Sequence, residues 1–362
     1  MHILKWFKLS LKQLILYAVI GIILTSSVLY SIEKSELSEE EVVEVVAKVS
    51  TSIPTKASCV AFVKNHQYVS YLENGILYVK NMKDSNLEHT IKEDGVISYA
   101  FTIEDRNLIV YFVHERRLLP VVTAVPEIKN DEDFESEAVE ITPLPLVKKY
   151  EEKLTIKTYD VVKKQASAYG SFQVANFSKM KQVTYSHLTN LIYANVEVKS
   201  KNGVVDRIFR INIEGNISTY LSGDIYKQLV LLDNADILYY ETSLNAVHDD
   251  KKRFSYEDEK KFHLLGKDAQ NSVYMQSITT PTEIIKVKKN KSVQAMALTD
   301  HTFKEVYSNQ NGLYLVYTDY VVDINNQSHK MAFDAGLKLL DIYKNMLFMK
   351  NDKDEILKVP IK

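Results

Sequence analysis

A strand-turn-strand pattern returns along most of this chain, and its spacing constrains the fold more than any other feature. The first copy is YVSYLENGILYVKN at residues 68–81, where aromatic and β-branched runs flank Glu73, Asn74 and Gly75. Asn-Gly between two such runs is a strong hairpin signal. Related runs follow at NLIVYFV (107–113), NLIYANV (190–196), ADILYYE (235–241), NGLYLVY (311–317) and NMLFMKN (345–351). We therefore expect many short antiparallel strands.

The spacing of these runs predicts the number of repeats. The positions that we take as equivalent are Ile76, Leu108, Leu191, Ile237, Val273, Leu313 and Leu347. They follow one another at similar intervals, except that the interval from Leu108 to Leu191 is about twice as long as the others. That interval has room for two repeats, and LTIKTYDVV at residues 154–162 is the candidate for the missing one. Repeats of roughly 40 residues made only of short strands are typical of propeller blades with four antiparallel strands.

We therefore predict an all-β chain whose residues 54–362 form a β-propeller of about seven blades, with six to eight allowed. The last run, from residue 345 onward, is expected to pair with residues 59–71 and so close the ring. A pair of β-sandwiches also explains short strands at regular spacing and remains the alternative. The phrase ENGILYVKN and the strand rhythm over residues 55–362 resemble, loosely, the TolB-type and related bacterial extracytoplasmic propellers. That resemblance implies a fold and little about function.

An uncharged apolar segment near the N-terminus predicts a membrane anchor. Residues 13–32, QLILYAVIGIILTSSVLYSI, contain no charged residue and match the roughly 20 residues that a transmembrane helix needs. Three lysines precede the segment, and positive charge stays on the cytoplasmic side. Residues 1–12 are thus predicted to be a cytoplasmic tail, residues 13–32 a single membrane span, and the residues that follow the span to lie on the extracytoplasmic side. A cleaved signal peptide is the alternative, with Ser26 and Ser27 as small residues for a peptidase.

Residues 33–53 are predicted to form a juxtamembrane stalk. Within it, Ser38 and Glu41 have capping-box spacing, and one stripe of a short helix would be formed by Val42, Val45, Val46 and Val49. Valine lowers helix propensity, so a strand or a partner-induced helix stays open. We interpret this segment as a spacer, with a docking helix as the alternative.

Two charged segments interrupt the strand rhythm. Residues 126–153 carry an acidic cluster from Asp131 to Glu137 followed by two prolines, which predicts an exposed inter-blade loop or insertion. Alternating acids in that cluster could offer oxygens to Ca²⁺, but the sharp-turn glycine of a dedicated calcium loop is missing. Residues 248–263 mix both signs and predict a long hairpin or surface helix; His248 and His263 lack a recognised metal spacing.

The sequence offers no catalytic, cofactor-binding or metal-binding residue that we would name. It contains no G-x-S-x-G, H-E-x-x-H, G-x-G-x-x-G or phosphate-binding loop. Cys59 is the only cysteine, so no disulfide forms within one chain, and we expect it to be a small buried apolar residue. Arg116 and Arg117 could contact an anionic polymer or lipid, but a charged strand end is the simpler interpretation. We therefore expect no cofactor and favour a protein that is not an enzyme.

The charge balance and predicted location lead to a functional hypothesis. A formal net charge of −2 gives no general attraction to nucleic acid. Lys, Asn, Ile and Tyr usage favours a low-GC Gram-positive bacterium. We expect a single-pass protein of the cell envelope whose propeller docks to an envelope protein complex. Binding or hydrolysis of cell-wall carbohydrate is the alternative: exposed aromatics with paired carboxylates would favour it, and an apolar patch with a polar rim would favour protein docking.

Overall fold

The computed structural model describes residues 47–83, 88–103, 106–119, 150–233, 237–257, 260–309 and 311–361. The predicted anchor at residues 13–32 and the acidic cluster near Asp131 lie outside these ranges. Among the residues that the structure describes, no helix is long and apolar enough to cross a bilayer.

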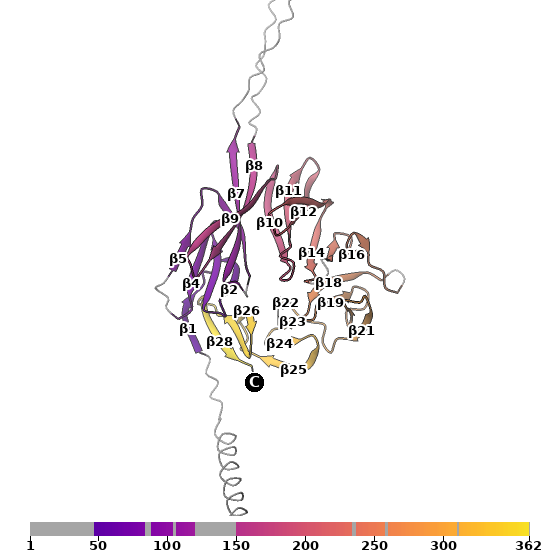
Figure 1. Cartoon of the computed structure of the whole chain (residues 1–362). Coiled ribbons are helices and arrows are strands. Elements are labelled where there is room, and N and C mark those ends of the chain that lie inside the picture. Colours follow the sequence, from indigo (N-terminus) through magenta and orange to yellow (C-terminus); the bar gives the residue numbers. More distant parts are fainter. Residues whose placement is uncertain are drawn as a thin grey trace, which may run out of the picture. The chain divides into compact units, whose positions relative to one another are not determined.

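The described residues form seven four-stranded antiparallel sheets, arranged as blades around a central axis (Figure 1). The prediction of an all-β propeller is therefore confirmed, with seven blades, and the β-sandwich alternative is wrong. We call the strands of a blade A to D, from the innermost to the outermost.

The first three blades are numbered in chain order. Blade 1 contains β2 (Ser58–Val63), β3 (Tyr68–Glu73), β4 (Ile76–Asn81) and β5 (Glu88–Ile91). Blade 2 contains β6 (Val96–Ile103), β7 (Leu108–Leu118), β8 (Tyr150–Asp160) and β9 (Gln165–Gln173). Blade 3 contains β10 (Phe177–Tyr185), β11 (Ile192–Ser200), β12 (Gly203–Ile211) and β13 (Ile217–Asp224).

Four blades complete the ring. Blade 4 contains β14 (Tyr226–Leu231), β15 (Leu238–Thr242), β16 (Val247–Asp249) and β17 (Lys252–Arg253). Blade 5 contains β18 (Phe262–Lys267), β19 (Val273–Ser277), β20 (Glu283–Val287) and β21 (Val293–Ala297). Blade 6 contains β22 (Glu305–Asn309), β23 (Gly312–Val316), β24 (Tyr320–Asp323) and β25 (Asn326–Ala332). Blade 7 contains β26 (Lys338–Tyr343), β27 (Met346–Lys350), β28 (Glu355–Pro360) and, outermost, β1 (Ala47–Ser52).

This topology gives the ring two different faces. The turns from strand A to B and from C to D lie on one face, which we call the AB face. The turns from B to C and the crossovers to the next blade lie on the other, the BC face. Because successive strands are antiparallel, blades 1 to 6 contribute the same kinds of turn to the same face, and blade 7 does so except for the C-to-D turn, since its strand D is β1.

The hydrophobic core lies between blades. Each described cluster of buried side chains joins two neighbours: one, for example, combines Val110 of blade 2 with Met180 of blade 3, and another combines Val230 of blade 4 with Leu264 of blade 5. Alternation along the strands presents one set of side chains to each neighbour, so both faces of a blade are apolar. Many tyrosines serve this packing, and Tyr111 is among the fully buried side chains.

The ring closes differently from the prediction. Residues 59–71 fall in strands A and B of blade 1, whereas the strand that pairs with β28 is β1, which lies within the segment predicted to be a stalk. Ile53, next to β1, is fully buried, and its N–H donates to the carbonyl of Asp354 at 2.8 Å. The propeller thus begins at Ala47 rather than at residue 54, because blade 7 needs a fourth strand to cover β28.

Six of the seven positions taken as equivalent lie in or next to strand B of blades 2 to 7, while Ile76 begins strand C of blade 1. The predicted extra repeat at residues 154–162 is wrong, since residues 154–160 belong to β8, strand C of blade 2. The long interval from Leu108 to Leu191 instead holds one blade with a long connection between β7 and β8. The insertion therefore lies within a blade rather than between blades, and its last predicted residues, 150–153, already belong to β8.

Candidate functional site

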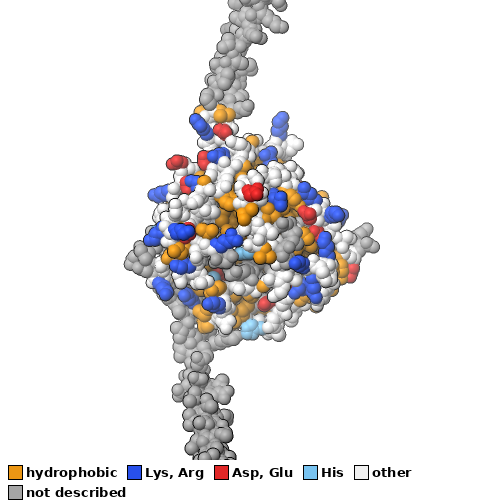
Figure 2. Space-filling view, viewed as in Figure 1, with side chains coloured by type: hydrophobic (Ala, Val, Ile, Leu, Met, Phe, Trp, Pro, Cys, Tyr) orange, Lys and Arg blue, Asp and Glu red, His pale blue; other side chains and the backbone are white. Residues whose placement is uncertain are grey.

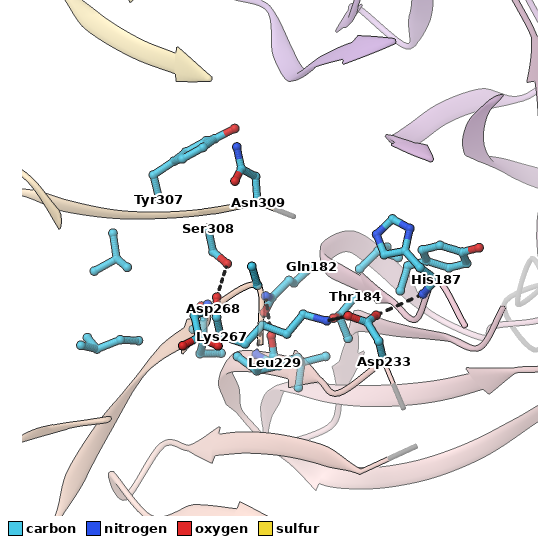
Figure 3. Close-up of a pocket in the computed structure, with 18 residues that line it drawn as sticks. Gln182, Thr184, His187, Leu229, Asp233, Lys267, Asp268, Tyr307, Ser308 and Asn309 are labelled. Atoms are coloured by element: carbon cyan, nitrogen blue, oxygen red, sulfur yellow. Dashed lines mark hydrogen bonds and ion pairs between the residues drawn. The ribbon is translucent and has the colours of Figure 1, made fainter. Parts of the chain in front are cut away.

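One described pocket lies in the central channel, at its AB end. Its walls come from strand A of blades 3 to 6 and from the turns that follow these strands, and its volume is about 480 Å³. Figure 3 shows that polar side chains from four blades point into this space, among them Gln182, Asp233, Lys267 and Ser308. By size and position this is the default place to look for a small ligand.

Most polar groups of this pocket are already committed to joining blades. The Lys267 ammonium lies 2.6 Å from a carboxylate oxygen of Asp233 in the neighbouring blade. The hydroxyl of Ser308 donates to the Lys267 carbonyl at 3.0 Å. Gln182 accepts from the N–H of Leu229 at 2.9 Å and donates to its carbonyl at 3.0 Å. The pocket therefore supports the ring and offers little unpaired charge to a ligand.

The pKa of Lys267 also fits a structural role for this side chain. Burial lowers the pKa of its ammonium, and the hydrogen bond and charge of Asp233 oppose the shift. An ammonium held by one carboxylate is a structural ion pair rather than an exposed anion-binding group.

A second polar cluster joins blade 7 to blades 1 and 6. The buried carboxylate of Asp341 lies 2.8 Å from Nε2 of His66, accepts from the hydroxyl of Tyr307 at 2.5 Å and accepts from the amide of Asn309 at 3.1 Å. The His66 ring stacks on Tyr343, with centroids 4.1 Å apart. Every group in this cluster has a partner, which favours a structural role.

Buried carboxylates also recur at three successive joints, which lie between blades 2 and 3, blades 3 and 4, and blades 4 and 5. In each case a carboxylate of one blade accepts a hydrogen bond from a backbone N–H of strand A in the next. The three pairs are Glu152 with the N–H of Phe177 at 2.9 Å, Asp206 with that of Tyr226 at 2.7 Å, and Glu241 with that of Leu264 at 2.9 Å. These bonds fix the height of one blade against its neighbour.

The exposed large apolar side chains are unevenly distributed. Those on the BC face are Val96, Leu118, Tyr150, Val204, Ile225 and Leu244. Those on the AB face are Val162, Leu188 and Ile213. All nine belong to blades 2 to 4 or to the crossover between blades 3 and 4, and blades 1, 5, 6 and 7 contribute none among the described residues.

A small apolar pocket opens on the AB side of the same region, between blades 2 and 3. Its lining includes Leu108, Tyr169, Tyr185 and Ile213. In the upper central part of the view, Figure 2 shows a group of hydrophobic side chains, near the place where Figure 1 shows β9 and β10.

Cys59 and Arg116, which stood out in the sequence, both contact other residues of the fold. Cys59 is only partly buried; it packs beside the core between blades 1 and 2, and burial raises the pKa of its thiol. Arg116 lies over the ring of Tyr150 at 3.9 Å and 3.3 Å from Glu152. It thus belongs to the β7–β8 hairpin rather than to a free basic site.

The two histidines of the charged segment 248–263 are separately engaged. His248 stacks on Tyr240, with centroids 4.9 Å apart, and Nδ1 of His263 lies 2.9 Å from Glu241. The segment itself forms the short hairpin of β16 and β17 and then leads into β18, so the surface-helix alternative is wrong.

No family model matches this sequence, and no curated protein matches it. Among solved structures, dipeptidyl peptidase 4 of Porphyromonas gingivalis is 9% identical with a TM-score of 0.41; the match covers 85% of this chain and 46% of the peptidase. This chain therefore spans about half of that protein. The calcium-binding protein regucalcin of Agrobacterium tumefaciens is 6% identical with a TM-score of 0.36, and the match covers 87% of this chain and 93% of regucalcin. Neither similarity carries an argument about activity.

Proposed function

We propose that this chain is a protein-binding scaffold that is anchored in the cell membrane by residues 13–32 and docks to an envelope protein complex through the BC face of blades 2 to 4. A β-propeller is a scaffold suited to binding. The location, the docking surface and the class of partner are what we propose in addition. It is carried by one observation: the six exposed large apolar side chains that the described residues place on the BC face all belong to blades 2 to 4 or to the crossover between blades 3 and 4.

The centre of the proposed surface lies where blades 3 and 4 meet. The hydroxyl of Ser243 donates to the carboxylate of Asp224 at 2.9 Å, which brings the exposed neighbours Leu244 and Ile225 close together. Lys227 supplies charge beside them, with its ammonium 3.4 Å from Glu241. An apolar centre with a charged rim is the anatomy of a protein interface. We call Val204, Ile225 and Leu244 the docking patch.

The same region fits a carbohydrate partner less well. Sugar binding commonly uses exposed aromatic rings, yet Tyr150 is the only aromatic residue among the nine exposed apolar side chains. The guanidinium of Arg116 already covers its ring. The carboxylates of Asp233 and Asp268 at the channel pocket are held by Lys267 and Lys286, at 2.6 and 2.9 Å. Paired carboxylates of this kind are poorly suited to the acid and base roles of glycoside hydrolysis.

The test is a crosslinking pull-down from whole cells that express the tagged full chain. One variant carries Ile225→Lys and Leu244→Lys, which places two charges in the docking patch. The control is Thr318→Lys, which changes an exposed residue in the corresponding BC turn of blade 6. We expect the same protein partners from the original chain and the control, and a loss of at least tenfold from the double variant. Equal capture by all three would refute docking through this patch.

Further measurements separate the location of the chain from its binding. Retention of the full chain in carbonate-washed membranes, and its digestion by protease added to intact spheroplasts, test the anchor and the outward orientation. Replacing residues 1–46 with an unrelated membrane span tests whether partners follow the propeller. If no protein follows it, while residues 47–362 sediment with isolated wall polysaccharide, the carbohydrate alternative replaces this proposal.

A further inference from the structure

The chain enters the propeller on the AB face. β1 pairs antiparallel with β28, and Ser52 lies opposite Glu355, next to the BC turn of blade 7. Ala47 lies at the other end of β1, toward the AB face. The C-terminal end lies on that face as well, since the N–H of Ile361 donates to the carbonyl of Asn345 in the AB turn of blade 7 at 2.8 Å. The first residue of β1 therefore lies at the AB face.

That face carries a cluster of exposed lysines on blades 4 and 5. They lie in or beside the C-to-D turns and comprise Lys251, Lys252, Lys288, Lys289 and Lys291. The cluster is continuous across the two blades, because the Lys291 ammonium lies 2.9 Å from Asp249, which is the cross-strand partner of Lys252. The neighbouring Asp250 accepts a hydrogen bond from the hydroxyl of Tyr220. Lysines therefore outnumber acids here, and the cluster is cationic.

The same face carries apolar turn tips on blades 2 and 3. Leu188, in the AB turn of blade 3, is 69% exposed, and Ile213, in the C-to-D turn of that blade, is 59% exposed. Val162 lies in the C-to-D turn of blade 2, directly before the exposed Lys163 and Lys164. Exposed apolar side chains beside lysines are the composition of protein surfaces that lie in the headgroup region of a membrane.

From these features we infer that the AB face of the propeller lies against an anionic phospholipid surface, with the lysines on headgroup phosphates and the apolar turn tips in the interface. This deepens the proposed function and rests on its membrane anchor. A short segment, residues 33–46, separates the predicted span from β1, and it reaches at most roughly 50 Å when fully extended. If the AB face lies on the bilayer, the docking patch on the BC face is on the opposite side of the propeller.

The test uses the full chain reconstituted into vesicles of phosphatidylcholine, with or without phosphatidylglycerol. Leu188 and Leu244 form a matched pair, because they are 69% and 75% exposed on opposite faces. Each is replaced in turn, as Leu188→Trp or Leu244→Trp, in a chain carrying Trp6→Phe, since Trp6 is the only tryptophan. We expect the emission of the first variant to shift to shorter wavelength only with phosphatidylglycerol, and the emission of the second to stay unchanged.

Lysine acetylation, read by mass spectrometry, gives an independent readout. We expect labelling of Lys288, Lys289 and Lys291 to fall several-fold in anionic vesicles and to recover at high salt. Lys201 and Lys353, exposed on the BC face, should label equally in both. Equal protection of the two faces, or no protection of either, would overturn the inference. So would equal protection of the AB lysines by soluble polyphosphate in neutral vesicles, because the face would then bind phosphate polyanions in general.

The outcomes also separate this inference from the proposed function. A chain that fails to float with vesicles of either composition lacks the anchor on which both rest. If the chain floats but shows neither the emission shift nor the lysine protection, the anchor survives and the lipid-facing surface does not.

Discussion

Replacing Ile53 by alanine should destabilise the propeller strongly, because this side chain fills the joint at which the ring closes. Ile53 has no exposed surface and belongs to a cluster with Phe62 of blade 1 and Phe348 and Ile356 of blade 7. Buried Ile→Ala substitutions cost about 2–5 kcal/mol. We expect a loss within this range, of about 3 kcal/mol, or roughly a hundredfold in the folding equilibrium constant.

The assay is urea unfolding of residues 47–362, followed by far-ultraviolet circular dichroism because this part of the chain contains no tryptophan. Ile225→Ala is the matched control, since Ile225 is 40% exposed and should cost less than about 1 kcal/mol. A change in the midpoint at constant slope would report stability alone. If both substitutions cost the same, the closing strand contributes no tightly packed joint, and the argument for β1 is refuted.

Three further predictions concern other parts of the ring. Asp206→Asn should cost about 2–3 kcal/mol in the same assay, because it leaves the largely buried ammonium of Lys181, 2.6 Å from the Asp206 carboxylate, without its charged partner; a cost below about 1 kcal/mol would show that the joint does not depend on the carboxylate. Gly215→Ala should cost about 2 kcal/mol, since Gly215 has a φ of +78° and an added Cβ would lie 2.6 Å from the carbonyl oxygen of Tyr169; an unchanged midpoint would contradict this. Hydrogen bonds from Lys350 and Thr55 lower the pKa of Asp354, so its contribution should be present above about pH 4 and lost as the pH falls through the folded-state pKa. The stability difference between the original chain and Asp354→Asn should therefore disappear in acid, and a constant difference from neutral pH to strongly acidic pH would contradict the assignment.

The sequence predicted the architecture through its strand-B runs, because those strands are buried on both faces and therefore apolar. Leu313 and Leu347 are both fully buried in such strands. The outer strands carry a weaker signal. β9, for example, is largely exposed, and β17 is only Lys252 and Arg253, so periodicity alone could not count strands within a blade.

The errors of prediction share a physical cause, which is that hydrophobic pattern does not specify pairing partners. Residues 154–160 alternate like a strand A or B, and only the pairing of β8 with β7 and β9 shows that they complete blade 2. β1 was predicted to be part of a stalk because Val49 belongs to a stripe of four valines that fits a short helix as well as a strand. Its place is set by the open edge of β28, which lies at the opposite end of the sequence.

The buried carboxylates at the joints were also beyond sequence reasoning. Glu152, Asp206 and Glu241 are among many acids, and what distinguishes them is burial beside a backbone N–H of the next blade. The exposed turn tips were more accessible. Leu188 stands in Ser-His-Leu-Thr-Asn and Leu244 in Thr-Ser-Leu-Asn, where an isolated leucine in a polar turn has no obvious use inside the fold.

Turn tips matter because propeller topology separates surface from core. A residue at the tip of a turn touches neither neighbouring blade, so it can change without disturbing the joints that hold the ring. Folding alone gives no reason for Leu244 in blade 4 where the corresponding turn of blade 6 has Thr318, since both are exposed. Exposing leucine to water is unfavourable and gains nothing in packing. Its confinement, with five similar residues of the BC face, to one sector of the ring is therefore best explained by a partner that covers that part of the face.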